Sequence, residues 1–175
     1  MKAVAELKKP YTENQHIDFL LENKIKNKYE IEYSDDAIIA WCKTEEDLLA
    51  DAKAVKRKEN SLKAREAVDN GWVEFKEARI ETNNRTSSDL GDARDACLAL
   101  GEDTYSWFSM DNKLVTLNIN KNNLQDDDFM KIKTLIAKFK NDIWLDKYRY
   151  FDLQINNAQT IEELNEITLD YSTSY

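Results

Sequence analysis

A wide apolar stripe between residues 129 and 144 constrains the fold of this chain more than any other feature. Its members recur at spacings of three and four residues, the repeat of one face of an α-helix. They are Phe129, Ile132, Leu135, Ile136, Phe139, Ile143 and Trp144. The triplet Asp126-Asp127-Asp128 precedes the stripe, where the positive end of a helix dipole favours acids. We therefore predict a long core helix that begins there and continues towards Asn157.

Four short β-prone segments accompany this helix. Residues 72–75 and 78–81 follow Gly71 and alternate in character. Residues 105–108 and 114–117 flank Asp111-Asn112, whose side chains tolerate tight-turn backbone angles. Trp107 is expected to anchor this second hairpin in the core. The prediction is an α+β fold, mostly helical, with a small antiparallel β-sheet packed against long helices.

A further helix is predicted between the two hairpins. Thr86 or Ser87 can cap it, and Gly101 is the natural stop. Its apolar positions step by three and four residues. They are Leu90, Ala93, Cys97 and Leu100. Cys97 is therefore expected to be a small core residue and not a reactive thiol.

The N-terminal part reads as a capped helix followed by a strand. Thr12 can cap a helix that extends to Lys28, with Ile17, Leu20, Leu21 and Ile25 on one face. Residues 29–33 alternate Tyr and Ile with Glu, as a strand would, and Ser34-Asp35-Asp36 reads as a turn or a cap.

A long charged helix is predicted from Thr44 to Asn70. Leu48, Val55 and Leu62 recur every seven residues, although Glu59 and Glu66 occupy the other positions of a coiled-coil seam. Two interpretations stay open: a seam that forms a homo-oligomer, or a thin stripe docked on the body of the same chain. The predicted organisation is an N-terminal segment 1–43, a helix 44–70 that serves as linker or oligomerisation element, and a compact domain 71–175.

Composition disfavours several partners and chemistries. The net charge of −9 repels phosphate backbones, so nucleic acid is not an expected partner. Cys42 and Cys97 lie far apart and outside any C-x-x-C pattern, which gives no support to a disulfide framework or a zinc site. No apolar run has the length of a signal peptide or a membrane span, so no membrane association is expected.

Catalytic signatures are weak. His16 is the single histidine and has no partner that the sequence identifies, and the three glycines form no phosphate-binding loop. Asp126-Asp127-Asp128 could be a metal cluster, but acids in a first helical turn explain it better. We expect no enzyme activity, cofactor, metal or small-molecule substrate.

An aromatic segment near the end of the long helix is the candidate contact surface. Trp144, Tyr148, Tyr150 and Phe151 lie close together in residues 144–151, and aromatic residues are enriched at interface hot spots. The alternative is that they belong to the core under Lys and Arg stems. With Leu48, Val55 and Leu62, these residues are the candidate protein-contact residues.

From about Leu62 to Tyr171, the chain resembles a domain of unknown function found in many phages and prophages. The shared order is a charged helix, a Gly-led aromatic strand, a strand ending in an acid and Thr, an Ala/Leu-rich helix, a Trp followed by Asp-Asn and a β run, a long helix, and a closing Ala-x-Thr-x-x-Glu-Leu. The residues of this chain that match these elements in turn are Leu62-Lys63-Ala64-Arg65, Gly71 to Phe75, Ile80-Glu81-Thr82, Trp107 with Asp111-Asn112 and 114–117, and Ala158 to Leu164. Arg79-Ile80 departs from the aromatic residue that usually precedes the acid.

In that family the domain forms the C-terminal part of small proteins encoded among tail-fibre and tail-assembly genes. The resemblance implies a protein that contacts a tail-fibre or other tail protein, as a fibre-assembly chaperone or an accessory virion component. It brings no catalytic residues, and it implies a location in the virion or in the host bacterial cytoplasm during assembly. The residues leave one alternative: a small acidic phage effector that inhibits a host protein or nucleic-acid-binding complex. Residues 71–175, with 12 basic and 19 acidic side chains, would supply its negative face.

Overall fold

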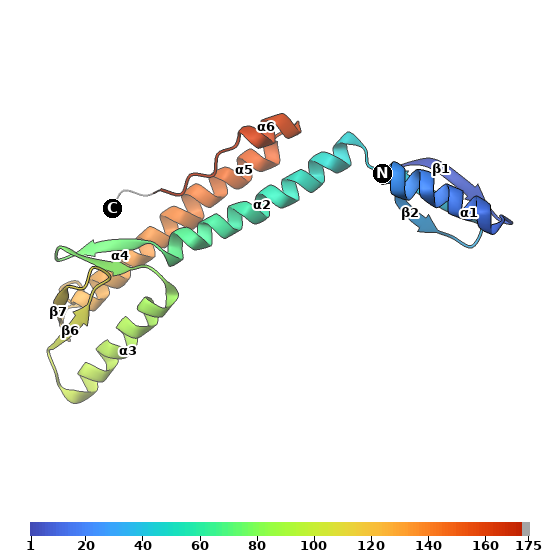
Figure 1. Cartoon of the computed structure of the whole chain (residues 1–175). Coiled ribbons are helices and arrows are strands. Elements are labelled where there is room, and N and C mark those ends of the chain that lie inside the picture. The colour runs from blue at the N-terminus through green and yellow to red at the C-terminus, as the bar shows by residue number, and fades with distance from the viewer. Residues whose placement is uncertain (173–175) are drawn as a thin grey trace. The chain divides into compact units, whose positions relative to one another are not determined.

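The computed structural model describes residues 1–172 and has an α+β fold, with 53% of residues in helices and 20% in strands (Figure 1). The chain divides into two compact units. The first comprises Met1–Val55 with Gln159–Ile161, and the second comprises Lys56–Ala158 with the described residues from Glu162 onward. The boundary falls within one helix, α2, Glu45–Asp69.

The first unit is built on a three-stranded antiparallel sheet with strand order β1-β3-β2. Its elements before α2 are β1 Lys2–Lys8, α1 Glu13–Leu20, the π-helical η1 Leu21–Lys26, β2 Glu30–Tyr33 and β3 Ala37–Cys42. The predicted helix and the strand after it are confirmed, as is the cap at Thr12. The Thr12 hydroxyl accepts from the N–H of Gln15 at 3.3 Å, and the Gln15 side chain accepts from the N–H of Thr12.

Two expectations for this unit were wrong. Ile17, Leu21 and Ile25 are exposed, and η1 buries Asn23 instead. The less exposed side chains are His16, Phe19, Leu20 and Asn23, so the helix turns a different face inward, and Ile17 is already exposed in α1, before η1 begins. The strands β1 and β3 were not predicted. β3 is the central strand and reads as the near-continuous apolar run AIIAWC, without the alternation that marks a half-buried strand.

The charged helix α2 begins where predicted. The Thr44 hydroxyl accepts from the N–H of Asp47 at 3.2 Å, and the Asp47 carboxylate accepts from the N–H of Thr44 at 2.8 Å. Its buried residues are Asn60, Ala64 and Val68, all in the second unit. The helix therefore docks through a different face from the predicted Leu48/Val55/Leu62 stripe.

The second unit contains two separate β-hairpins and the long helices that cover them. Its elements after α2 are β4 Trp72–Phe75, β5 Ala78–Glu81, α3 Asn84–Leu100, β6 Thr104–Phe108, β7 Leu114–Asn118, α4 Asp128–Asn141, the π-helical η2 Asp142–Tyr148, α5 Arg149–Asn157 and α6 Ile161–Glu166. All four predicted strands of this region are confirmed. They form the two-stranded sheets β4-β5 and β6-β7 and not a single sheet.

The predicted apolar stripe lies at the centre of the core. Phe129, Ile132, Ile136, Phe139 and Ile143 are all buried, and helical backbone continues from α4 through η2 into α5. The α2 segment, both hairpins and α3 pack around it. Their contributions are Ala64, Val68, Val73, Ala78, Ile80, Leu90, Cys97, Val115, Leu117 and Ile119. The core placement of Cys97 is thereby confirmed.

Gly71 marks a close approach between α2, β4 and α4. A Cβ at this position would lie 2.4 Å from Cζ of Phe139 and 2.6 Å from the carbonyl oxygen of Ala67. Both distances are far below van der Waals contact, so no larger residue fits without movement of the backbone or the ring.

Helix α3 differs from the prediction at its N-terminal cap and at Leu100. Its cap is Asn83, whose side-chain oxygen accepts from the N–H of Thr86 at 2.8 Å, and neither Thr86 nor Ser87 caps it. Gly101 ends it in the left-handed conformation, as predicted. Leu100, expected on the apolar face, is 77% exposed because it is the last residue of the helix.

The β6-β7 hairpin packs its Trp107 side against the core. Val115 and Leu117 are buried on β7, while Trp107 is half-buried on β6. The turn uses Asn112 in the left-handed region, with a φ of 58°. The Asp111 carboxylate accepts from the Ser109 hydroxyl at 2.6 Å and from the N–H of Arg79 at 3.0 Å, which joins this turn to β5. These hydrogen bonds hold the pKa of Asp111 well below its usual range.

No helix within residues 1–172 is both long enough and apolar enough to cross a membrane.

Candidate protein-contact site

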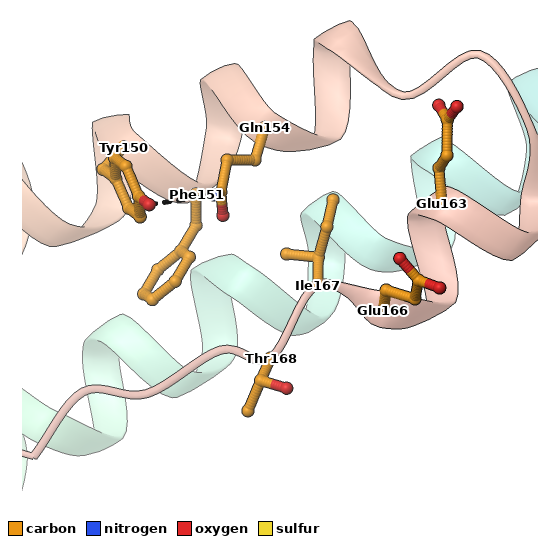
Figure 2. Close-up of a pocket in the computed structure, with 7 residues that line it drawn as sticks. All are labelled: Tyr150, Phe151, Gln154, Glu163, Glu166, Ile167 and Thr168. Carbon is orange, nitrogen blue, oxygen red and sulfur yellow. Dashed lines mark hydrogen bonds between the residues drawn. The ribbon is translucent and has the colours of Figure 1, made fainter.

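A pocket of about 360 Å³ lies between α5 and the chain that includes and follows α6 (Figure 2). One wall comes from α5 and the other from α6 and the two residues after it. The lining residues are Tyr150, Phe151, Gln154, Glu163, Glu166, Ile167 and Thr168. The pocket thus contains two of the candidate contact residues, Tyr150 and Phe151.

Aromatic side chains support the floor of the pocket. Phe151 is buried, and its ring lies 5.4 Å from that of Tyr150 and 5.4 Å from that of Tyr171. Ile167 projects from the opposite wall towards α5 (Figure 2). Tyr150 is held from the side, because its hydroxyl accepts from the Gln154 amide at 2.9 Å.

A buried polar network fixes the segment behind the pocket. The Tyr171 hydroxyl donates to the side-chain oxygen of Asn60 at 2.6 Å, and the Asn60 amide donates to the carbonyl of Tyr148 at 3.2 Å. Asn60 is completely buried, so these bonds satisfy a polar group that would otherwise be costly in the core. Burial raises the pKa of Tyr171 to about 12. The network connects α2, η2 and the C-terminal segment into one wall.

The rim of the pocket is polar and acidic. Gln154 on α5, and Glu163, Glu166 and Thr168 on the other wall, are its polar lining residues (Figure 2). None of the seven lining residues is a Lys, Arg, His or Cys. Carboxylates and neutral hydrogen-bonding groups beside aromatic rings suit a polar or cationic side chain.

The four aromatic candidates divide between core and surface. Trp144 and Tyr148 pack edge to face at 5.4 Å, are half-buried and contact the core, and Phe151 is buried. Tyr150 alone of the four is mainly exposed, at 57%. The exposed apolar residues of this region also include Leu145 and Leu153, which the sequence analysis did not single out.

The α2 candidates are all exposed. Leu48, Val55 and Leu62 have exposed fractions of 46%, 70% and 50%. Leu62, which belongs to the second unit, therefore does not dock on the body of that unit, and docking of Leu48 and Val55 stays a prediction. A seam with a second chain stays a prediction.

Two of the three consecutive aspartates, Asp127 and Asp128, act as helix-capping or ion-pairing groups at the start of α4. Asp127 is the N-cap of α4, and its carboxylate accepts from the N–H of Met130 at 3.2 Å and from Nε of Arg94 at 3.0 Å. Asp128 lies 2.6 Å from Nζ of Lys76. Burial raises the pKa of Asp128, but hydrogen bonds from Lys76, the Asn118 N–H and Lys131 outweigh it and keep the pKa below its usual range. The capping interpretation is confirmed.

Other chemistry-bearing groups have ordinary surroundings. Nε2 of His16 lies 3.5 Å from the Tyr33 hydroxyl. Cys42 and Cys97 are free thiols. Across residues 1–172, no three His, Cys, Asp or Glu side chains are grouped as a metal site would require.

A second, smaller pocket of about 230 Å³ lies within the first unit. Met1, Glu30, Ile31, Glu32 and Trp41 line it, and the Trp41 indole donates to the Glu32 carboxylate at 2.8 Å. The sequence analysis missed this pocket because it did not recognise β3, which carries Trp41.

Comparison of the chain with protein-family models, with curated protein sequences and with solved structures gives no match.

Proposed function

We propose that this protein acts by protein–protein contact in the assembly or structure of a phage or prophage tail. Its partner would be a tail-fibre or other tail protein, and its role that of a fibre-assembly chaperone or an accessory virion component. The order of sequence elements from Leu62 to Tyr171, with its phage-domain resemblance, motivates the choice of system. The surface around the α5 pocket supports the mode of action.

The observation that carries the proposed mode of action is the exposed apolar surface beside that pocket. Tyr150 is 57% exposed and Leu153 is 60% exposed, and both lie on α5, which forms one wall of the pocket. A protein interface needs a small number of large side chains that become fully desolvated, surrounded by a polar rim. Tyr150, Leu153 and the acidic rim have this composition.

Co-expression with the neighbouring fibre protein tests the chaperone role. The expected result is a co-purifying complex and a larger soluble fraction of the fibre protein. Tyr150→Glu with Leu153→Glu should abolish the complex, because it places two charges in the desolvated centre. Leu124→Glu is the matched control, since Leu124 is 55% exposed but lies outside α5 and the pocket lining.

The outcome that would end the chaperone proposal is absence of both complex and solubility gain with the unaltered chain. Equal loss with the Leu124 control would remove α5 from the proposal. Mass spectrometry of purified particles tests the alternative role as a retained virion component, which requires peptides of this protein in the particle.

A further inference from the structure

The two edges of the β6-β7 hairpin differ in how their backbone groups are satisfied. The pair has antiparallel register, with Ser106 opposite Thr116. The N–H of Ser109 bonds to the carbonyl of Lys113 at 2.9 Å, and the N–H of Ile119 bonds to the carbonyl of Asp103 at 2.9 Å. In an antiparallel ladder the bonded pairs alternate, so every second residue of each strand directs its N–H and C=O away from its partner strand. The outward residues are Thr104, Ser106 and Phe108 on β6, and Leu114, Thr116 and Asn118 on β7.

The outer edge of β7 is occupied by charged side chains. Nζ of Lys76 donates to the carbonyl of Thr116 at 2.9 Å, and the Asp128 carboxylate accepts from the N–H of Asn118 at 2.9 Å. Lys76 and Asp128 are themselves paired at 2.6 Å. Charged groups on a strand edge are a common means of blocking the addition of a further strand.

The outer edge of β6 has no such protection. Within residues 1–172, no other element or side chain bonds the outward backbone groups of Thr104, Ser106 and Phe108. All three residues are exposed, and Phe108 is 73% exposed. The strand TYSWF contains no charge and no proline, and its ladder with β7 is regular, without a bulge.

The remaining edge strands each carry a feature that discourages pairing. β1 contains Lys2, Glu6 and Lys8 and a register shift between Ala3 and Ala5. β2 contains Glu30 and Glu32, and β4 contains Glu74. On β5, the N–H of Arg79 donates to Asp111 and its carbonyl accepts from the N–H of Met110. In a chain of net charge −9, β6 is thus an edge where a second copy meets no like charge.

We propose that β6 is a self-association edge, where two copies of this chain pair their β6 strands in antiparallel fashion. A two-fold axis at Ser106 sets Thr104 against Phe108 of the second copy, Ser106 against its own equivalent, and Phe108 against Thr104. The three outward residues of one copy then face the same three of the other, so every outward N–H meets a C=O.

Side chains support the same register. The axis brings Tyr105 of one copy beside Trp107 of the other, on the half-buried side of the hairpin. Cross-strand aromatic pairs are among the favourable pairs in antiparallel sheets. The product is a four-stranded sheet with β7 strands at both outer edges. This inference does not depend on the proposed tail function.

Light scattering and sedimentation equilibrium across a concentration series test the proposal. The unaltered chain should move from 20.5 kDa towards twice that mass as its concentration rises. Ser106→Lys should keep the mass near 20.5 kDa over the same range, because the axis sets the two lysines against each other. Thr116→Lys is the matched control: Thr116 is the cross-strand neighbour of Ser106, but it lies on the occupied edge. It should associate like the unaltered chain.

A disulfide experiment tests the register. Directly bonded residues of antiparallel strands have Cα atoms about 5.5 Å apart, within the range that a disulfide spans. Ser106→Cys should therefore form a covalent dimer on mild oxidation. Thr116→Cys should not, because its equivalents would lie three strand spacings apart, about 14 Å. The unaltered chain, with Cys42 and Cys97, is oxidised in parallel as a blank.

Three results would overturn the proposal. The first is a mass of 20.5 kDa for the unaltered chain at every concentration, which would also exclude a stable self-contact elsewhere. The second is normal dimerisation of Ser106→Lys with unchanged circular dichroism. The third is dissociation by Leu48→Glu with Leu62→Glu while Ser106→Lys has no effect, which would place the contact on α2.

Discussion

Removal of the Asp127 carboxylate should destabilise the second unit more than any other single acid-to-alanine change in residues 126–128. Asp127 is completely buried, and it serves as helix cap, as partner of Arg94 and as acceptor for the N–H of Asn120 at 3.3 Å. Loss of an N-cap costs about 1 kcal/mol. Removal of one partner of a buried ion pair costs about 3–5 kcal/mol, because the other charge stays without a counter-ion.

The two contributions share the same carboxylate, so they are not added in full. Arg94 retains 16% side-chain exposure, which lets water compensate part of its charge and favours the lower end of the range. We therefore expect Asp127→Ala to lower the free energy of unfolding by about 3 kcal/mol. With a urea slope of about 2 kcal/mol per molar, the midpoint should fall by about 1.5 M. Asp127→Asn, which keeps a cap acceptor, should lose less.

Urea unfolding followed by tryptophan fluorescence measures this change, with Trp107 and Trp144 as reporters in the same unit. Asp126→Ala is the matched control, because Asp126 is exposed and its carboxylate accepts from the side-chain amide of Asn123. Addition of Arg94→Met to Asp127→Ala should restore part of the loss, since it removes the uncompensated charge. A loss no larger than that of Asp126→Ala, or no recovery in the double variant, would refute this explanation.

Three further changes test other parts of the second unit. Gly71→Ala should lower the melting temperature sharply, because its Cβ would lie 2.4 Å from the Phe139 ring. Gly91→Ala is the control: its Cβ meets only the flexible end of Lys133, so it should be neutral or add up to about 1 kcal/mol of helix propensity. Similar melting temperatures for both variants would contradict the packing argument. Tyr171 has a folded pKa of about 12 against about 10 when unfolded, so its stabilising contribution is complete below pH 10 and is lost as pH rises through 12. Urea midpoints at pH 9 and pH 11 should therefore differ more in the unaltered chain than in Tyr171→Phe, and equal differences would show that this phenol does not contribute. Asp128→Ala should leave the N–H of Asn118 at the outer edge of β7 without its acceptor and thereby increase aggregation on heating, measured as turbidity. If Asp128→Ala aggregated no more than Asp126→Ala, the Asp128 carboxylate would not protect this strand edge.

Elements with strong local signals were predicted well. The stripe from Phe129 to Ile143 has α-helical spacing, and all its members except Leu135, which is 37% exposed, are buried because α4 packs against α3, β4 and β7. The turn of the β6-β7 hairpin was found because Asn112 tolerates the left-handed conformation that it adopts there. Caps at Thr12 and Thr44 were found because the capping side chain and its acceptor partner lie within four residues.

Features that depend on tertiary contacts were not predictable. The exposed face of α2 has the stronger heptad pattern, yet the helix buries Asn60 and Ala64, because Asn60 bonds to Tyr148 and Tyr171 from distant parts of the chain. β3 has no alternation, since side chains on both of its faces are buried or half-buried. In the candidate contact site, Tyr150 and Phe151 were proposed from the sequence, but Glu163 and Glu166 were not. These two acids line the same pocket only because the chain turns back after α5 and places α6 beside it.

The pairing between Lys76 and Asp128 at the outer strand of the second hairpin limits what this sheet can become. A sheet that is open at both sides can recruit strands without end, and the product is a polymer. Here one side is already closed by the protein's own side chains. A second molecule can then add only at the unprotected side, and the resulting dimer has a protected strand at each outer side of its sheet. The same interaction that joins two molecules therefore also prevents a third from adding.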